Sequence, residues 1–251
     1  MIAVTDHDTT SGIQEACDEA QRWSVDVICG IEINTEYRGR EVHVLGYFID
    51  PENSDLQRRL ETVRMHRVQR MSKMVERLRA AGVEIDEEDV RRHGRGESLG
   101  RPHVAQALVA KKYAFHVADA FERWLRPECP GYVPRESLDP FEAISLITQA
   151  GGVPVLAHPL HLGSDGVIED LIAGGLRGLE VYYPTHSPTH IAYFSDLADA
   201  HGLGKTGGSD FHGPQIKRVD VGDVDFSLAG LRAFCETVGR DVPRLARGGR
   251  L

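Results

Sequence analysis

Short apolar segments that end in ionisable side chains recur along this chain, and they limit the folds that it can adopt. The first, residues 1–4, runs directly into Thr5-Asp6-His7-Asp8. Four others end at Glu32, at His43, at His158 and at Asp210-Phe211-His212. Polar groups at the ends of hydrophobic strands are typical of a site at one rim of a parallel sheet or barrel. The pattern therefore predicts an α/β protein with one polar site.

Signals for strands and helices alternate along most of the chain. The expected strands cover residues 2–5, 25–33, 42–49, 153–157, 178–182 and 203–207, and the second and third of these are rich in Val and Ile. Helix N-terminal signals lie between them: Ser11-Gly12-Ile13-Gln14 resembles a capping box, and Asp139-Pro140 and Ser187-Pro188 place proline after a capping residue. This alternation favours parallel strands.

One stretch interrupts the alternation. Between residues 55 and 132 no strand is expected, and apolar residues recur at helical spacing. They begin with Leu56, Leu60, Val63, Met71, Val75 and Leu78. We expect residues 1–54 and 133–251 to form a barrel and residues 55–132 to form a helical insertion that caps the site. The arginines of this stretch are interleaved with acids, which favours a solvated face over a polyanion surface.

Charge and hydropathy argue against several classes of function. The 251 residues include 29 basic and 38 acidic side chains, a formal charge of −9, which disfavours duplex nucleic acid as a partner. The apolar runs are shorter than the roughly 20 residues that span a bilayer, and no secretory signal is visible. The four cysteines are scattered, as is usual in a reducing compartment. We expect a cytoplasmic protein with no membrane partner.

Six residues at the predicted strand ends have the chemistry of metal ligands. They are His7, Glu32, His43, His158, Asp210 and His212. Imidazole and carboxylate ligands together suit divalent ions such as Mn, Fe or Zn. A lone buried histidine is usually only hydrogen-bonded, but six ionisable groups on one rim are costly to bury without a cation. The remaining candidates are expected to be surface or capping histidines: His161, His186, His190 and His201.

Several motifs resemble those of the PHP family, named for polymerase and histidinol phosphatase. The motifs are Thr5-Asp6-His7-Asp8-Thr9-Thr10, Gly30-Ile31-Glu32, His43-Val44-Leu45-Gly46-Tyr47, Gly100-Arg101-Pro102-His103, Ala157-His158-Pro159 and Gly208-Ser209-Asp210-Phe211-His212. The most similar branch contains stand-alone bacterial phosphoesterases that act on nucleotides and short oligonucleotides. The resemblance implies a distorted seven-stranded β/α barrel that holds two or three metal ions.

The same resemblance implies a role for each candidate ligand. Glu32 resembles the carboxylate that bridges the first two ions, and His43 and His158 resemble the other ligands of the second ion. Asp210 is similar to a ligand of the first ion. His7 and His212 resemble ligands of the third. Manganese is the expected ion, with Fe or Zn as alternatives.

The resemblance also implies the reaction. A hydroxide that bridges two ions is expected to attack phosphorus, so that no side-chain nucleophile is required. The expected substrate is a nucleotide phosphomonoester, such as a nucleoside 3′,5′-bisphosphate, or the end of a short oligonucleotide. A histidinol-phosphate-type phosphatase on the same scaffold is the alternative enzyme.

An acidic chain needs a local cationic group to hold a substrate phosphate. Arg101 opens a predicted helix, where backbone N–H groups favour anions, and its guanidinium fork suits bidentate phosphate binding. His103 lies further along the same turn and is a second candidate for contact with the phosphate. Arg135 occupies a position that is usually basic in this branch, with an ion pair to a neighbouring glutamate as the equal alternative.

The chain departs from the family pattern at its beginning. Family members open with a strand that ends in His-x-His, followed by Ser-Asp-Gly, before the Thr-Asp-His motif. We therefore expect a barrel without its first strand and helix, and a first metal site without two of its histidines. One interpretation is a start codon assigned too late in the gene. The other is a non-catalytic protein that binds a metal or a phosphorylated ligand.

Overall fold

The computed structural model describes residues 1–94, 99–134, 137–163, 165–213 and 219–242. The chain divides into two compact units, one made of Met1–Gln57 with Ser137–Leu251 and the other of Arg58–Glu136. The second unit covers nearly the same residues as the predicted helical insertion. That the insertion caps the site stays a prediction.

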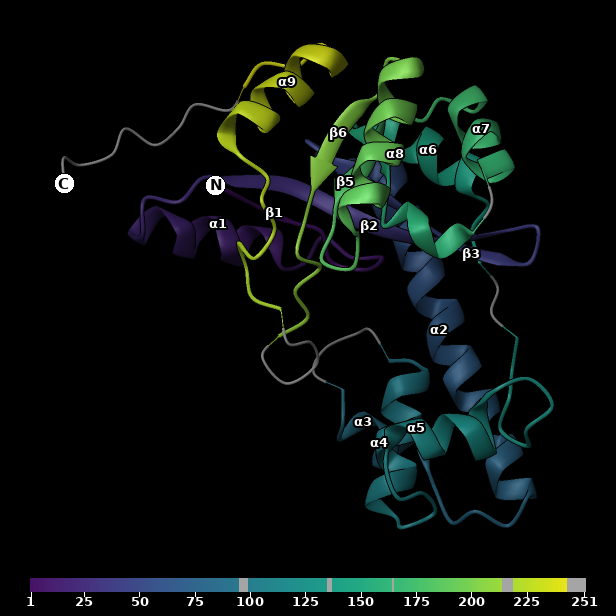
Figure 1. Ribbon diagram of the computed structural model, residues 1–251. Helices are drawn as coiled ribbons and strands as arrows, with labels where there is room; N and C mark the ends of the chain where they lie inside the picture. Colours follow the sequence, from purple (N-terminus) through teal and green to yellow (C-terminus); the bar gives the residue numbers. More distant parts are fainter. Residues whose placement is uncertain (95–98, 135–136, 164, 214–218, 243–251) are drawn as a thin grey trace. The chain divides into compact units, whose positions relative to one another are not determined.

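Six strands form one mixed sheet in the described part of the first unit (Figure 1). They follow one another in chain order: β1 (Ile2–Val4), β2 (Val27–Tyr37), β3 (Arg40–Tyr47), β4 (Val153–Leu156), β5 (Gly178–Tyr182) and β6 (Gly204–Gly207). Each predicted strand is present, and β2 continues four residues past its predicted end. The arrangement confirms the predicted α/β class and is consistent with a distorted barrel.

The direction of β3 corrects the expectation of parallel strands. β1 and β2 pair in parallel, as do β4, β5 and β6, but β3 is antiparallel to both β2 and β4. The physical reason is the two-residue connection between β2 and β3. Arg38 has a φ of 52° and Gly39 a φ of 73°, and two central residues with positive φ form the turn that matches the twist of a hairpin. So short a connection cannot join parallel strands.

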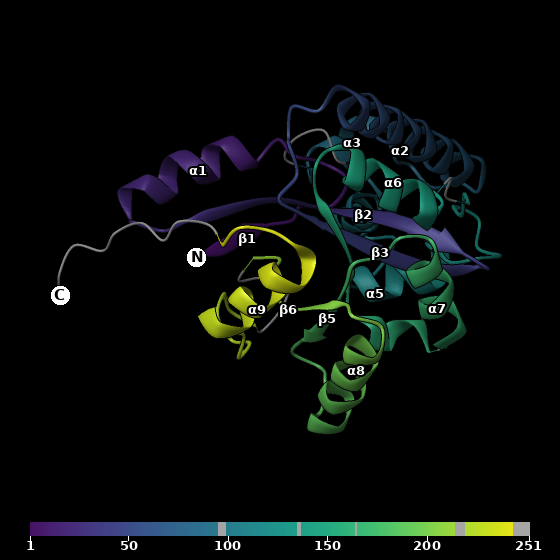
Figure 2. The same cartoon turned by 90° about the horizontal axis from the view of Figure 1, so that it is seen from above.

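Helices of the first unit pack along the sheet (Figures 1 and 2). They are α1 (Ile13–Arg22), α6 (Pro140–Gln149), α7 (Asp165–Ala173), α8 (Pro188–Ala200) and α9 (Leu228–Val238), with a 3₁₀ turn, η2 (Pro159–Leu162). The cap signals before α6 and α8 are confirmed, since Asp139 accepts from Phe141 N and Ser187 accepts from His190 N.

The capping box predicted before α1 is wrong. Gly12 occupies the cap position, and no side chain caps the first turn of this helix. Ser11 belongs instead to the preceding turn, because its backbone N–H donates to the hydroxyl of Thr9 at 3.2 Å. The Ser11 hydroxyl, which would have to cap the helix, instead accepts a hydrogen bond from Thr9 Oγ1 at 3.1 Å, a local side-chain bond that competes with the cap.

The core of the first unit lies between the sheet and its helices. Ile31, Ile33 and Val155 are completely buried. Gly46 on β3 is required by packing, because a Cβ there would lie 2.9 Å from the side chain of Ile147 on α6. The close approach of this helix brings its apolar face onto the strands that carry the candidate ligands.

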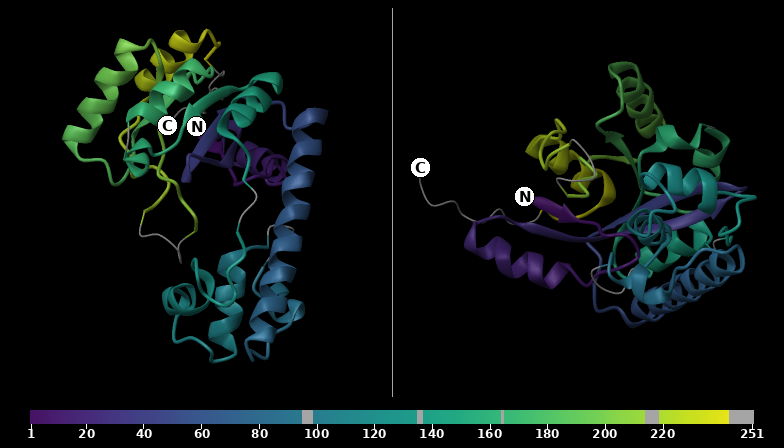
Figure 3. Two further views of the ribbon diagram at one scale, coloured as in Figure 1. Left: turned by 90° about the vertical axis from the view of Figure 1, so that its right-hand side faces the viewer. Right: turned by 90° about the horizontal axis from the view of Figure 1, so that it is seen from below.

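The second unit is helical in the residues that the structure describes (Figure 3). It contains α2 (Ser54–Ala80), which begins in the first unit, then α3 (Glu87–Arg91), α4 (Arg101–Ala110), α5 (Val117–Ala120) and a π-helical turn, η1 (Phe121–Leu125). Met71, Leu78, Leu108 and Leu125 are fully buried members of its separate core. The unit can therefore bury an apolar core of its own.

Two expectations drawn from composition can be compared with the structure. Over the described residues, every helix is too short or too polar to cross a lipid bilayer. All four cysteines lie in the described ranges and have free thiols.

Candidate metal centre

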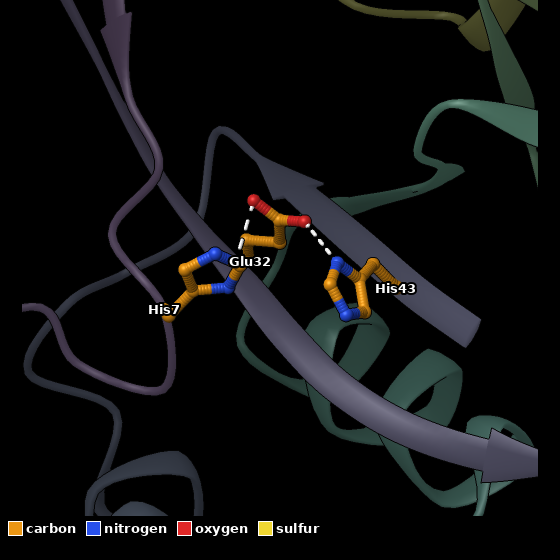
Figure 4. A group of neighbouring side chains, drawn as sticks. All are labelled: His7, Glu32 and His43. Carbon is orange, nitrogen blue, oxygen red and sulfur yellow. Dashed lines mark hydrogen bonds and ion pairs between the residues drawn. The ribbon is translucent and has the colours of Figure 1, made fainter. Parts of the chain in front are cut away.

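Glu32, a buried carboxylate on β2, lies at the middle of the candidate centre. In the β2–β3 hairpin Glu32 pairs with Leu45, and His43 pairs with Asn34. Glu32 and His43 are therefore diagonal neighbours on one face of the hairpin. His43 Nδ1 lies 2.7 Å from Glu32 Oε1 (Figure 4).

His7 reaches Glu32 from the loop that follows β1. Backbone hydrogen bonds extend the β1–β2 pairing into this loop, because Asp8 N donates to Glu32 O and Glu32 N donates to Asp6 O. His7 Nδ1 lies 3.7 Å from Glu32 Oε2. Ligand atoms of His7, Glu32 and His43 all lie within 4.8 Å of one another. Figure 4 shows the imidazoles of His7 and His43 on either side of the Glu32 carboxylate.

His158 joins this group from the end of β4. Its Nε2 atom lies 3.3 Å from Glu32 Oε1. Its ring centroid lies 4.9 Å from that of His43. Three imidazoles thus approach one buried carboxylate, a concentration of nitrogen and oxygen ligand atoms that suits a divalent ion.

The segment after β6 brings the last two candidates to the same region. The ring centroid of His212 lies 5.6 Å from that of His7. His212 Nδ1 lies 3.2 Å from Asp210 Oδ1, and Asp210 Oδ2 accepts a hydrogen bond from Tyr183 at 2.9 Å. The structure therefore gathers all six candidates from five places in the chain. That each is a ligand stays a prediction.

Mutual contacts set the protonation states of the group. Burial raises the pKa of Glu32, but hydrogen bonds with His158 and His43 outweigh burial and hold this pKa well below its usual range. Burial lowers the pKa of His43, but the carboxylates of Glu32 and Glu41 raise it to about 9. Burial also lowers the pKa of His7. At neutral pH the metal-free protein therefore pairs a charged Glu32 with a charged His43, beside a neutral His7.

One buried atom tests whether these residues fit a metal. His43 Nε2 is shielded from solvent and has no hydrogen-bond partner. It lies 3.3 Å from Glu41 Oε1, but without hydrogen-bond geometry. Without hydrogen-bond geometry the nitrogen is poorly satisfied, and coordination to a metal ion would satisfy it better. The imidazole and carboxylate donor set fits a divalent cation.

Three of the eight non-glycine residues with positive φ in the described ranges belong to or adjoin this group. Asp8 has a φ of 54°, His158 a φ of 29° and Asp210 a φ of 50°. Each such conformation costs about 1–3 kcal/mol and persists only where the surroundings impose it. His158 and Asp210 are predicted ligands, and Asp8 follows the predicted ligand His7, so the surroundings of the group must hold these three backbones in place.

A cavity of about 910 Å³ opens beside the centre. Five of the six candidates line it: His7, Glu32, His158, Asp210 and His212. Residues of both end strands of the sheet, β1 and β6, also contribute to its wall, together with apolar side chains such as Phe226 and Phe234. Its volume lies in the range of cavities that bind small organic ligands.

The predicted phosphate-binding residues lie outside this unit or outside the described residues. Arg101 begins α4 in the second unit, and its guanidinium lies 5.8 Å from the ring centroid of Phe121. His103 Nδ1 accepts a hydrogen bond from Gly100 N at 3.1 Å, and burial lowers the pKa of His103. Arg135 is not among the described residues. Phosphate binding by these three side chains stays a prediction.

The sequence does not single out three polar residues that contact the candidates. Asn34 Nδ2 donates to Asp8 Oδ2 at 2.9 Å and lies 3.1 Å from His7 Nδ1. Glu180 and Tyr183, at β5, contact His158 N and Asp210 respectively. A signal for Glu180 exists, since it is an acid inside an otherwise apolar, buried strand.

The four histidines expected at the surface or at caps have mixed outcomes. His190 Nδ1 accepts a hydrogen bond from Ser187 N in the capping box of α8, and His201 follows the last turn of α8. His186 is buried, with Nδ1 2.8 Å from Val181 O, so the prediction for it is wrong. His161 is exposed, and its ring centroid lies 4.7 Å from that of His158.

The known proteins most relevant to this chain are enzymes that hydrolyse phosphate esters of nucleotides or RNA. No protein-family model matches the chain. A 3′,5′-nucleoside bisphosphate phosphatase from Chromobacterium violaceum is 32% identical over 248 residues, covering 96% of this chain and 86% of that protein. The chain belongs to the PHP family of phosphoesterases. The Escherichia coli 5′-3′ exoribonuclease Rnm is 33% identical to this PHP phosphoesterase over 220 residues, 85% of the chain and 75% of the relative.

Solved structures agree with this membership. A Bifidobacterium adolescentis protein described as a metal-dependent phosphoesterase superimposes with a TM-score of 0.81 at 32% identity, covering 95% of this chain and 87% of that one. An amidohydrolase from Chromobacterium violaceum, solved with bound sulfate and no metal, gives a TM-score of 0.78 at 33% identity, with coverages of 89% and 80%. The PHP phosphoesterase is thus a metal-dependent hydrolase of phosphate esters, which confirms the predicted family and enzyme class.

Proposed function

We propose that this phosphoesterase hydrolyses phosphomonoesters of nucleotides, such as nucleoside 3′,5′-bisphosphates, or the ends of short oligonucleotides. The observation that carries the proposal is the buried Glu32 carboxylate with three imidazoles around it, beside a cavity of about 910 Å³. The names of the relatives support the substrate class, since one acts on nucleoside bisphosphates and another is an exoribonuclease.

We propose that the six candidates hold two or three divalent ions, with manganese as the native metal. Glu32 would be a ligand of the first two ions, with His43 and His158 as the other ligands of the second. Asp210 would be a ligand of the first ion, and His7 and His212 would be ligands of the third. When bound, the ions supply activation of the attacking water and neutralisation of charge at phosphorus.

The protein's own side chains prepare this site. Glu32 stays ionised because its hydrogen-bonded histidines outweigh burial, and His7 stays neutral because it is buried, so both have the charge state that metal binding requires. His43 must lose a proton first. We propose that Arg101, His103 and Arg135 bind the substrate phosphate, supported by their motifs and by the planar guanidinium geometry that suits phosphate.

We also propose a cytoplasmic location and a preference for single nucleotides or single strands over duplexes. The formal charge of −9 supports this preference, because an acidic surface repels long polyanions. Release of nucleotide from single-stranded and duplex oligonucleotides of one sequence, at the same ionic strength, tests it. Equal rates on both would contradict the preference.

A substrate panel tests the reaction. The manganese-loaded chain is offered a nucleoside 3′,5′-bisphosphate, a short 5′-phosphorylated oligonucleotide and histidinol phosphate, and phosphate release is measured. We expect kcat/KM for the nucleotide substrates to exceed that for histidinol phosphate by about tenfold or more, equivalent to about 1.4 kcal/mol. EDTA should abolish the activity.

Glu32→Gln, purified in the same way, shows how much phosphate release comes from contaminating phosphatases. Faster hydrolysis of histidinol phosphate would favour the alternative phosphatase. No hydrolysis above the Glu32→Gln background would favour a non-catalytic protein that binds metal or phosphate.

A further inference from the structure

Strand β5 supplies none of the six candidate ligands, although it lies between two strands that do. Its neighbours are β4, which is followed by His158, and β6, which is followed by Asp210 and His212. β5 nevertheless contains the buried Glu180 and is followed directly by the buried Tyr183. Glu180 contacts His158, which follows β4, and Tyr183 contacts Asp210, which follows β6.

Glu180 holds the backbone of His158. Its side chain is 4% exposed, and Oε2 accepts a hydrogen bond from His158 N at 2.9 Å. His158 has a φ of 29° and a ψ of 61°, a conformation that needs support from its surroundings. The other oxygen, Oε1, faces Gly208, where a Cβ would lie only 2.9 Å away. A glycine at 208 therefore leaves room for the carboxylate to reach His158.

Tyr183 holds the side chain of Asp210. Its hydroxyl donates to Asp210 Oδ2 at 2.9 Å. The ring centroid of Tyr183 lies 5.6 Å from that of His158. One tyrosine thus touches a candidate ligand after β6 with its hydroxyl and a candidate ligand after β4 with its ring.

We propose that Glu180 and Tyr183 are positioning residues of the metal centre: they fix His158 and Asp210 in place before an ion binds. This inference rests on the proposed function, because it takes His158 and Asp210 to be ligands. Hydrogen bonds that orient metal ligands reduce the ordering that binding must otherwise impose, and their loss commonly weakens metal binding 10–100-fold. Ligands without such support would bind the ions more weakly.

Tyr183→Phe tests the role of the hydroxyl. The variant keeps the ring beside His158 and removes only the donor to Asp210. Tyr182→Phe is the matched control, because it removes a hydroxyl from the neighbouring tyrosine. The Tyr182 ring packs instead on Phe226, with 5.8 Å between the ring centroids. Affinity for Mn²⁺ is measured by calorimetry, and thermal stability is measured in EDTA. We expect about tenfold weaker Mn²⁺ binding for Tyr183→Phe, with Tyr182→Phe like the wild type and similar metal-free stability for both.

Two substitutions of Glu180 test the second contact. Glu180→Ala removes the acceptor for His158 N, whereas Glu180→Gln keeps an oxygen that can accept the same hydrogen bond. We expect a loss of Mn²⁺ affinity of about tenfold or more for Glu180→Ala and recovery of most of it in Glu180→Gln. Gly208→Ala, which crowds the carboxylate, should also weaken Mn²⁺ binding.

The outcomes separate this inference from the function on which it rests. Wild-type protein that binds no Mn²⁺ contradicts both. Wild-type protein that binds Mn²⁺ while Tyr183→Phe and Glu180→Ala bind it equally well overturns the positioning role alone. If either variant loses affinity only in proportion to lost metal-free stability, its residue supports the fold rather than the ligands, which also overturns the proposal.

Discussion

The proton on His43 makes the strength of metal binding depend on pH in a specific way. In the metal-free protein the Glu32 and Glu41 carboxylates outweigh burial and raise the pKa of His43 to about 9. Metal ions bind the deprotonated imidazole, so binding below this pKa must displace a proton. His7 contributes no such proton near neutrality, because burial lowers its pKa. Binding should therefore release close to one proton per chain from these two residues.

The size of the effect follows from this pKa. Below pH 9 the fraction of deprotonated His43 rises tenfold per pH unit, so Mn²⁺ affinity should rise about a hundredfold between pH 6.5 and 8.5, or about 2.7 kcal/mol. Stability of the metal-free protein has the opposite sign. A raised pKa stabilises the fold fully below the unfolded value of 6.5, and this contribution of about 3 kcal/mol is lost as pH rises through 9.

Calorimetric titration with Mn²⁺ at pH 6.5, 7.5 and 8.5, in buffers of different ionisation enthalpy, measures affinity and proton release together. His43→Gln should lose the pH slope, and His201→Gln, at an exposed histidine after α8, should keep it. If Mn²⁺ affinity does not change with pH, or if binding releases no proton, then His43 is not protonated in the metal-free protein and the reasoning is refuted.

Three further substitutions test the surroundings of the centre. Asn34→Ala removes the amide between Asp8 and His7 and should weaken Mn²⁺ binding about 10–100-fold; unchanged affinity by calorimetry would dismiss that contact. Leu108→Ala, at a fully buried position of the second unit, should cost about 2–5 kcal/mol in urea unfolding and leave metal content unchanged. Gly39→Ala, at a φ of 73°, should cost about 1 kcal/mol, and no loss would argue against the two-residue turn.

Local patterns predicted most of the fold. Runs rich in Val and Ile located β2 and β3, and the prolines at 140 and 188 marked two helix starts. The direction of β3 was missed because it depends on two residues, Arg38 and Gly39, whose positive φ values make a hairpin. An Arg-Gly pair is a weaker signal for such a turn than Asn-Gly.

The candidate site was predictable in part, for a physical reason. Carboxyl ends of parallel strands meet at one edge of a sheet, which accounts for His7, His158 and the Asp210–His212 segment, since these follow β1, β4 and β6. Glu32 and His43 lie inside β2 and β3 and not at strand ends, and the register of the antiparallel hairpin brings them together. Glu180 and Tyr183 could not be placed in the same way. Their contacts join residues 22 and 27 positions apart, and such hydrogen bonds depend on register and rotamers that a strand pattern does not specify.

The metal content of Glu32→Ala tests the central claim most directly. Elemental analysis after dialysis against Mn²⁺ should find bound metal in the wild type and in Glu36→Ala, an exposed acid on the same strand. Because Glu32 has three candidate histidines around it, Glu32→Ala should lose most of that metal and, with it, phosphoesterase activity. Wild-type metal content in Glu32→Ala would contradict the account of this site.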